Sequence, residues 1–471
     1  MQHAKLARLD GRLVMLGFGS IGQGVLPLIL RHVELDPSRI TILSRGRRGR
    51  AVAAEHGIAF HAETLTPANL EALLALHLRA GDFLLNLSYG VSSLAVLDWC
   101  QRHGVGYLDA CIEPWEGGHE DPATPPEQRS NYAYREAALS LRRQGVSAPT
   151  AVINHGVNPG LVSNFIKRAL LHLARDTGCE APPLREREDW ARLACALGVR
   201  VIHIAERDTQ VASRPKRPGE FVNTWSAEAF IGESCQPAEL GWGTHERQLP
   251  PDGVRHERGC GAAIWLRRPG AATRVRSWTP LAGSYHGFLI THAESISIAD
   301  ALTLRERGQV VYRPTVHYAY HPCDDAVLSL HELAGRNWQA QERTCLLMDE
   351  LIDGLDELGV LLLGHARTAY WYGSRLTLAE ARALAPCNNA TTLQTAAGVL
   401  GGLVWAINHP GRGVVEPDDL DHEEVLAAAE PYLGEMAGVY GDWTPLQGRG
   451  GLFPEDVDYE DPWQFGNVRV C

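Results

Sequence analysis

Three glycines near the start of the chain have the spacing of a dinucleotide-binding turn. An apolar run of strand length leads into Gly17, Gly19 and Gly22, and a helix-like apolar pattern follows them. The first glycine permits a tight turn, the second lets a pyrophosphate approach the backbone, and the third lets the helix pack close to the strand. The start of that helix offers free N–H groups to the phosphates. We expect the cofactor to be bound by Gly17, Gly19, Ser20, Ile21 and Gly22; the alternative is a tight turn in another kind of α/β protein.

The position expected to bind the adenosine ribose has no carboxylate. An acidic residue about twenty residues beyond the glycines usually accepts hydrogen bonds from the ribose hydroxyls. Here Ser44 stands in that region, and Arg45, Arg47 and Arg48 follow it. A serine followed by arginines suits the 2′-phosphate of NADP. The alternative is that the arginines solvate a helix start and that other contacts hold NAD, and taken alone this site favours NADP slightly.

Several carboxylates, one tryptophan and one histidine stand where a second domain would close on the nicotinamide. They are Glu113, Glu206, Trp225, Glu233, His292 and Glu294. Carboxylates supply charge and hydrogen bonds to an alkyl ammonium ion, and the indole face supplies cation–π attraction. Each residue taken singly also has an ordinary explanation, since a strand-end glutamate is usually solvated and a tryptophan usually belongs to the core.

Most of these residues are expected next to the ends of strands. Glu206 ends a predicted strand over 201–205, and Trp225 ends one over 221–224. Glu233 falls in a glycine-containing turn. His292 and Glu294 end a predicted strand over 288–291.

The first third of the chain alternates predicted strands and helices. Strands are expected at 12–16, 40–43, 83–87, 107–110 and 151–154, and helices at 47–56, 68–78, 93–102 and 131–143. This alternation predicts an α/β fold with a Rossmann-type doubly wound parallel sheet, whose ligands bind at the carboxyl ends of the strands. Leu87, Ser88, Asp109 and Asn158 follow such ends and complete the predicted cofactor site.

The rest of the chain has a different pattern. Strand-like runs dominate from 199 to 372, so we expect a second α+β domain with a largely antiparallel or mixed sheet. A glycine-punctuated apolar helix is expected over 391–408. The predicted division is a dinucleotide-binding domain over 1–157, a substrate-binding and dimerisation domain over 158–440, and an extended tail over 441–471 that packs on the body.

Composition argues against several kinds of protein. The chain has 471 residues and a net charge of −12, with no basic stripe to meet nucleic acid. Its ten cysteines include no CxxC pair, and its start lacks a signal-peptide pattern, so we expect a cytoplasmic protein. The longest apolar run, 396–407, is shorter than a membrane span. His317, His321 and Cys323 have a spacing seen in zinc sites, but a strand-like pattern there disfavours a metal.

Several short stretches carry a family resemblance over nearly the whole chain. They are 17–22, 112–115 (IEPW), 156–160 (GVNPG), 203–210 (HIAERDTQ), 222–226 (VNTWS), 237–245 (PAELGWGTH), 291–297 (THAESIS), 318–322 (YAYHP) and 461–465 (DPWQF). Together they are more specific than the glycine turn. In these stretches the sequence resembles the bacterial homospermidine synthases, which are related to saccharopine dehydrogenases.

The resemblance implies a homodimer in which NAD acts as a tightly held prosthetic group. Hydride leaves a terminal carbon of putrescine, a second diamine displaces ammonia from the imine, and the stored hydride reduces the new Schiff base. The product is homospermidine, with no net redox change. Spermidine and related diamines are further substrates that the resemblance implies.

The resemblance also assigns roles residue by residue. It implies catalytic roles for Glu206, Trp225, Glu233 and His292, and substrate binding by Glu113, Asn158 and Glu294. The general base is either Glu206 or His292, since a tuned carboxylate or imidazole works near neutral pH. Ser44 departs from the aspartate that the family has, so NADP is a second possible cofactor.

Two other functions fit part of the pattern. A saccharopine-type NAD(P)-dependent oxidoreductase acting on an amine or amino acid would exchange its cofactor at each turnover. Its carboxylate-bearing substrates require arginines, whereas the predicted pocket is acidic and aromatic. A non-enzymatic dinucleotide sensor, the second alternative, needs no convergent carboxylates or indole.

Overall fold

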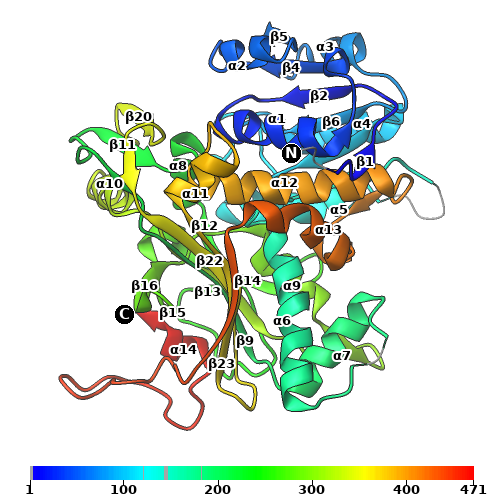
Figure 1. Cartoon of the computed structure of the whole chain (residues 1–471). Helices are drawn as coiled ribbons and strands as arrows, with labels where there is room; N and C mark the ends of the chain where they lie inside the picture. The colour runs from blue at the N-terminus through cyan, green and yellow to red at the C-terminus, as the bar shows by residue number, and fades with distance from the viewer. Residues whose placement is uncertain (1–3, 120, 143–146, 182, 471) are drawn as a thin grey trace.

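The computed structural model of the chain describes residues 4–119, 121–142, 147–181 and 183–470. Its first sheet is parallel throughout (Figure 1). The strands of this sheet lie in the spatial order β24 (Val414–Val415), β8 (Ala151–Val152), β7 (Gly106–Asp109), β6 (Phe83–Asn86), β2 (Leu13–Leu16), β4 (Ile40–Ser44) and β5 (Ala59–Ala62). Strands β2, β4, β6 and β7 match the strands expected from sequence, with ends that differ by a residue or two.

Helices cover both faces of this sheet. Side chains alternate along β2, so that Leu13 and Met15 join one apolar cluster while Val14 and Leu16 join another. The first cluster includes α1 (Ser20–His32) and α12 (Ala390–Asn408), and the second includes α3 (Leu70–His77) and α4 (Ser93–His103). The predicted doubly wound parallel sheet is confirmed. Two further helices of this region are α2 (Arg50–Glu55) and α5 (Asn131–Leu139).

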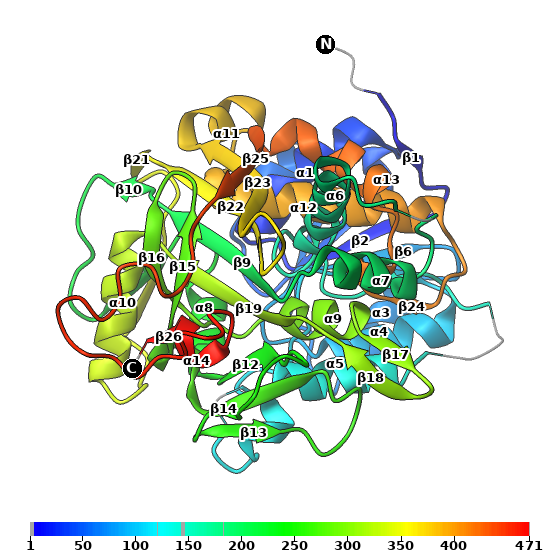
Figure 2. The same ribbon diagram turned by 90° about the horizontal axis from the view of Figure 1, so that it is seen from below.

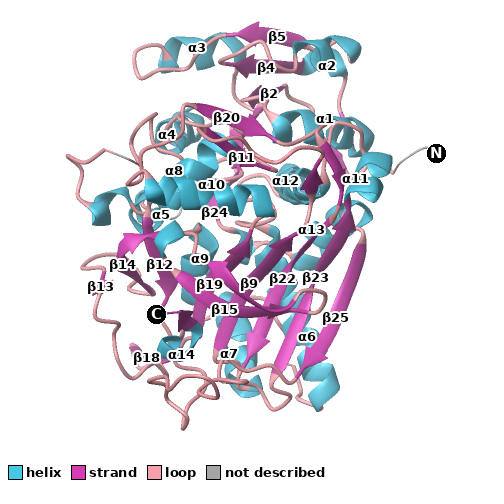
Figure 3. Ribbon diagram, turned by 90° about the vertical axis from the view of Figure 1, so that its left-hand side faces the viewer, coloured by secondary structure: helices cyan, strands magenta, loops and turns pink. Residues whose placement is uncertain are grey.

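The second sheet is mixed, as the sequence predicted (Figure 3). Strands β9 and β19 pair in parallel, and the other pairings are antiparallel. The main order is β13 (Gly253–Arg255), β14 (Ala263–Pro269), β12 (Pro237–Gly241), β19 (Thr315–His321), β9 (Val201–Asp208), β22 (Leu355–Leu363), β23 (Ala369–Thr377) and β25 (Glu435–Gly441).

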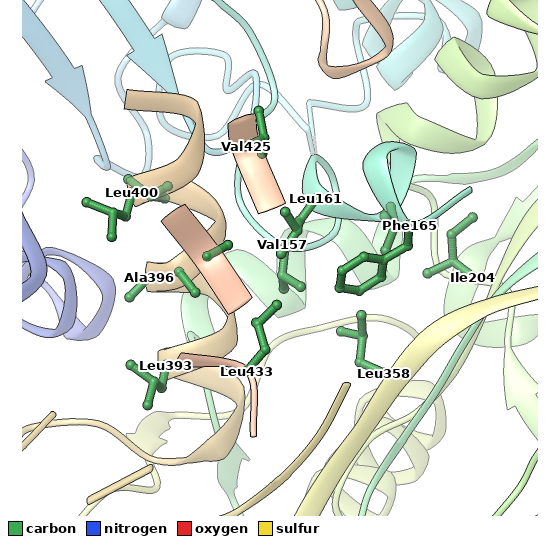
Figure 4. Packing of buried hydrophobic residues seen from close by; sticks show 14 of the residues in the cluster. Val157, Leu161, Phe165, Ile204, Leu358, Leu393, Ala396, Leu400, Val425 and Leu433 are labelled. Atoms are coloured by element: carbon green, nitrogen blue, oxygen red, sulfur yellow. The ribbon is translucent and has the colours of Figure 1, made fainter. Parts of the chain in front are cut away.

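One apolar core joins the two layers. Helix α6 (Leu161–Thr177) lays its buried face on the second sheet, where Phe165 packs with Ile204 and Leu358 (Figure 4). Leu393 and Leu400 of α12 belong to the same cluster, so this helix serves both layers. The shared core fixes the two sheets against each other and thereby fixes the space between their strand ends.

Helix α12 is the only described helix long and apolar enough to cross a membrane by length and composition. The predicted helix over 391–408 is confirmed, and it extends beyond the apolar run over 396–407 because it begins at Ala390. In the folded protein, 89% of the most apolar 18-residue stretch of this helix is buried, as is typical of a core helix.

The chain returns to each layer late in the sequence. Strand β24 pairs with β8 of the first sheet, and β26 (Arg469–Val470) pairs with β15 (Arg274–Thr279) of the second (Figure 2). Strand β15 also pairs with β16 (Gly283–Phe288). We keep the division at residue 158 and the tail after 440 as proposals, with the addition that α12 and β24 pack with the first layer.

The remaining elements are small and lie around these layers. Two-stranded sheets join β1 (Ala7–Arg8) to β3 (Val33–Glu34), β10 (Val211–Ala212) to β21 (Leu351–Asp353), β11 (Glu220–Asn223) to β20 (Arg343–Leu346), and β17 (Leu304–Glu306) to β18 (Gln309–Tyr312). The other helices are α7 (Arg187–Leu197), α8 (Ala227–Cys235), α9 (Ala293–Ala301), α10 (Asp324–Gly335), α11 (Leu378–Leu384), α13 (His422–Ala429) and α14 (Phe465–Val468).

Candidate active site

A cavity of about 670 Å³ lies where the strand ends of the first sheet meet the second sheet. Most of the residues proposed from sequence line it, and they come from both layers. These are Gly17, Gly19, Ser20, Ile21, Gly22, Ser44, Leu87, Ser88, Glu113, Asn158, Glu206, Trp225, Glu233 and His292.

The glycine turn has three different environments. Gly17 has a φ of +84°, and a Cβ built there would lie 2.5 Å from the carbonyl oxygen of Leu87. At Gly22 a Cβ would lie 3.1 Å from the Gly17 carbonyl oxygen, whereas at Gly19 it would meet no described atom within 4 Å. Helix α1 begins at Ser20 without a side-chain cap on its first N–H groups. A tight turn, open space above the second glycine and free N–H groups are what a dinucleotide pyrophosphate requires.

The ribose end of the cavity carries both signs of charge. Ser44, Arg45, Arg48 and Glu116 line it. An ion pair joins Arg45 Nη1 to Glu116 Oε1 at 3.1 Å, with both side chains more than half exposed. Because exposed pairs are weak, Arg45 can leave Glu116 for a 2′-phosphate at small cost.

Asp109 does not line the cavity formed by the described residues. Its buried carboxylate accepts hydrogen bonds from the backbone N–H of Asn154 at 2.6 Å and from the hydroxyl of Tyr107 at 2.7 Å. Burial raises the pKa of Asp109 to about 7, and those donors oppose the rise. Asn154 in turn accepts from the N–H of Ile112 at 2.9 Å. Asp109 therefore supports the loop that carries Glu113 instead of facing the space for a cofactor.

Glu113 lies in that loop with a buried histidine beside it. Its backbone N–H donates to Ser93 Oγ at 3.0 Å, and its Oε2 lies 3.3 Å from His119 Nε2. The other ring nitrogen of His119 contacts Gln236 Nε2 at 2.9 Å. The loop thus presents a fixed, buried carboxylate to the cavity.

Glu206 stands near the end of β9 and is the most deeply buried carboxylate that lines the cavity. Asn158 Nδ2 donates to its Oε2 at 2.7 Å, and the hydroxyl of Tyr318 donates to the same oxygen. Burial raises the pKa of Glu206 to about 7, although both donors pull it down. A carboxyl with a pKa near neutrality can take up and return a proton at physiological pH.

His292 lies between two carboxylates. Its Nε2 is 3.1 Å from Glu233 Oε2, and its Nδ1 is 3.2 Å from Glu294 Oε1. Burial alone lowers the pKa of His292, but the charges of Glu294 and Glu233 outweigh it and raise the pKa to about 10. The imidazole is therefore positively charged at neutral pH.

The structure corrects the sequence-based positions of this group. Strand β16 ends at Phe288 and helix α9 begins at Ala293, so His292 precedes a helix and Glu294 lies in its first turn. The apolar run over 288–291 is short, and such runs do not distinguish a strand from buried irregular chain. Glu233 lies on α8 and not in a turn, because the neighbouring Gly232 is packed within the helix. Glu294 does not line the cavity in the described structure and reaches it only through His292.

Trp225 is tied to the glycine turn. Strand β11 ends at Asn223, and Trp225 lies in the turn before α8, where Ser226 caps the helix. Ser20 Oγ donates to the carbonyl oxygen of Trp225 at 2.7 Å. The half-buried indole lines the cavity, so the cofactor turn and the predicted cation site share a hydrogen bond.

Comparison with known proteins gives the same relationship over the full chain. Residues 13–153 match the saccharopine dehydrogenase NADP binding domain, and residues 156–442 match the saccharopine dehydrogenase C-terminal domain. The homospermidine synthase of Blastochloris viridis is 54% identical over 98% of both chains, and that of Mesorhizobium japonicum is 50% identical over 98% of this chain and 97% of its own. This chain belongs to the homospermidine synthases of the saccharopine dehydrogenase family.

A solved homospermidine synthase structure agrees with this placement. The enzyme of Legionella pneumophila, crystallised in complex with NAD, superposes with a TM-score of 0.92 at 49% identity, and the match covers 98% of each chain. This protein and the Legionella pneumophila enzyme therefore share the same fold.

Some cavity residues of this family member escaped the sequence analysis. Tyr318 and Tyr320 line the cavity from β19, and Trp115 and Glu228 line it from the loop after β7 and from α8. The strand-like alternation over 316–320 is a signal that could have placed both tyrosines on one strand face. Nothing in the sequence showed that β19 would pair with β9, the strand that carries Glu206.

The described residues of this family member contain no group of three or more histidine, cysteine or acidic side chains placed to hold a metal. His317, one of the residues weighed for zinc, is buried and packs against His203 with ring centroids 4.1 Å apart. Burial lowers the pKa of both imidazoles, so both are neutral at physiological pH.

Proposed function

We propose that this protein joins two diamines into homospermidine and releases ammonia. One observation carries the proposal: the dinucleotide turn faces Glu206, Trp225 and the Glu233–His292–Glu294 group across a single cavity. That arrangement gives a redox cofactor, a base and a cation site direct access to one substrate. Putrescine is the expected substrate, with spermidine or related diamines as others, as the relatives' activity suggests.

The cofactor we assign is NAD, the dinucleotide in the Legionella pneumophila complex. When bound, it supplies a hydride acceptor that returns the hydride within the same reaction. Gly17, Gly19, Ser20, Ile21 and Gly22 would hold its pyrophosphate, and Ser44, Leu87, Ser88 and Asn158 line its space. NADP remains a second cofactor, because no carboxylate at Ser44 repels a 2′-phosphate.

Glu206 fits the role of general base better than His292. A diamine enters as a dication, and its reacting nitrogen must lose a proton before hydride can leave the adjacent carbon. His292 is protonated at neutral pH and cannot accept that proton. Glu206 has a pKa of about 7 and lines the cavity. It can therefore take the proton during oxidation and return one during reduction.

His292 has a different role in this proposal. Its positive charge lies between the carboxyl groups of Glu233 and Glu294 and offsets part of their negative charge. We assign Glu233 and Glu113 to the ammonium groups, and Glu294 to holding His292 in place.

Trp225 is assigned to the developing cation. Oxidation places positive charge on the reacting carbon and nitrogen, and an indole face attracts such charge. In a site shielded from water this contact is worth about 2 kcal/mol. The hydrogen bond from Ser20 fixes the turn that carries the ring next to the cofactor site.

The test is to incubate the purified protein with putrescine and a catalytic amount of NAD, and to analyse the products by mass spectrometry. Homospermidine and ammonia without accumulation of NADH support the proposal. Release of one NADH for each substrate oxidised would support a saccharopine-type dehydrogenase. Tight NAD binding without turnover of any amine would support a dinucleotide sensor.

We further propose a cytoplasmic homodimer. The resemblance to the family supports the dimer, and the absence of disulfides among the nine described cysteines fits a reducing compartment. Light scattering coupled to gel filtration tests the dimer, since a single species of twice the chain mass is expected and a monomeric mass would contradict it.

A further inference from the structure

Tyr318 contacts both the proposed base, Glu206, and the histidine of the proposed cation site, His292. Its hydroxyl donates to Glu206, and its ring lies against the ring of His292 with centroids 4.6 Å apart. The side chain is 2% exposed and lines the cavity. Among the described residues, Tyr318 alone both donates a hydrogen bond to Glu206 and makes a ring contact with His292.

The strand register explains this position. Strands β9 and β19 pair in parallel with Tyr320 opposite Glu206 and Tyr318 opposite Ile204. Residues two apart on a strand share a face, so both tyrosines and Glu206 lie on one face of the sheet. Tyr320 stacks on Tyr318 at 5.1 Å with a 10° angle between the rings, which further restricts the ring of Tyr318.

The hydroxyl of Tyr318 acts as a hydrogen-bond donor. Burial and the nearby Glu206 charge raise the pKa of Tyr318 well above its ordinary value, so it keeps its proton throughout the range in which the enzyme works. Asn158 donates to the same Oε2 of Glu206. Two donors therefore converge on Oε2. The carboxylate also interacts with the buried carboxyls of Asp208 and Asp356, and with the charge of His292, which lowers the pKa of Glu206.

We propose that Tyr318 is a positioning residue, which orients the Glu206 carboxylate through its bond to Oε2 and which fixes His292 by ring contact. This inference rests on the proposed diamine reaction. It adds a requirement of its own, namely that the base and the cation site are oriented by one side chain. A donor to the carboxylate also favours the ionised form of Glu206, which keeps it a base near neutral pH.

Tyr318→Phe removes the donor and keeps the ring. Without it the pKa of Glu206 rises, so the base loses its proton only at higher pH. The acid limb of the kcat profile should move up by about one pH unit, with a roughly fivefold fall in kcat at neutral pH and little change in KM. Tyr312→Phe is the matched control, because it also removes a tyrosine hydroxyl bond to a backbone carbonyl, that of Val199, and Tyr312 is not among the residues that line the cavity. Its pH profile should equal that of the unaltered protein.

A double variant separates positioning from a general loss of structure. If Tyr318 acts through Glu206, Tyr318→Phe should cause no further loss of kcat when placed in Glu206→Gln. A further loss of roughly fivefold in that background would overturn the inference, and so would an unshifted acid limb in Tyr318→Phe alone. Thermal unfolding of each variant shows that it is folded. If the unaltered protein makes no homospermidine, the proposed function fails and this inference fails with it, whereas homospermidine with identical pH profiles removes only this inference.

Discussion

The two halves of the cavity are built in different ways. The pyrophosphate end of the cofactor half is made of backbone from one contiguous strand, turn and helix, in which Gly17, Gly19 and Gly22 each have a different steric environment. The substrate half is made of side chains from distant segments, including β9, α8 and β19. Its members depend on one another, as Glu206 depends on Asn158 and Tyr318.

This difference predicts how each half fails. A side chain added at a glycine of the cofactor half fills the space of the pyrophosphate, so such a substitution should weaken dinucleotide binding first. A side-chain network is lost one charge at a time, and its loss should affect turnover while the dinucleotide still binds.

Glu206→Gln should have the largest effect on turnover. Removing a positioned general base costs roughly 10²- to 10⁴-fold in kcat, while NAD binding should be unchanged. In the unaltered protein kcat should fall as the pH drops below about 7, because Glu206 becomes protonated there. Glu246→Gln is the control, since burial raises the pKa of Glu246 to about 7 too but it lies outside the described cavity lining. Equal loss of NAD binding in Glu206→Gln would show that the two halves are not separable.

Gly19→Val should damage the other half alone. A Cβ at Gly19 meets no described atom within 4 Å, so the variant should unfold at the same temperature as the unaltered protein. The added side chain occupies the space of the pyrophosphate, and NAD should bind roughly hundredfold more weakly, about 2.7 kcal/mol. Gly17→Ala is the contrast: its Cβ would lie 2.5 Å from the Leu87 oxygen, so it should lower the unfolding temperature. Calorimetric titration and thermal unfolding distinguish the two, and unweakened NAD binding in Gly19→Val would place the cofactor elsewhere.

Trp225 tests whether the indole acts by its electron-rich face. Trp225→Ala should lose roughly thirtyfold in kcat, the equivalent of about 2 kcal/mol, if the contact is made chiefly in the transition state. Trp225→Phe should keep part of the activity, and Trp225→Lys should be nearly inactive because it places a like charge against the iminium. Turnover per folded protein is the measurement, with thermal unfolding beside it. Normal turnover per folded Trp225→Ala would leave the residue only a packing role.

Ser44→Asp should have the smallest effect, on cofactor choice. A carboxylate at the ribose repels a 2′-phosphate and accepts bonds from the ribose hydroxyls. The preference for NAD over NADP should increase by about tenfold, which is one hydrogen bond to a charged group. Glu116→Gln, which frees Arg45 from its ion pair, should shift the preference the other way by less. If the unaltered protein binds NAD tightly and NADP not at all, the arginines have no part in cofactor choice.

The sequence predicted the cofactor half better than the substrate half, for a physical reason. The order of strand, glycine turn and helix is local, so Gly17 to Gly22 could be placed from spacing alone. The substrate half depends on sheet register, which pairs β9 with β19 over a long stretch of chain and places Tyr320 opposite Glu206. Glu233 was expected in a turn because a glycine precedes it, yet packing keeps that glycine inside α8. Glu294 and Asp109 were read as lining residues, and both instead support residues that face the cavity.

The central claim is that hydride taken from one diamine is returned to the product in the same site. Putrescine that carries deuterium on both terminal carbons tests it directly, with the protein, unlabelled NAD and an excess of unlabelled NADH in solution. The account predicts homospermidine that retains all of the deuterium of its two precursors, because the cofactor does not leave between the two half-reactions. Product that has lost one deuterium per molecule to the NADH pool would contradict it, since the cofactor would then exchange as in an ordinary dehydrogenase.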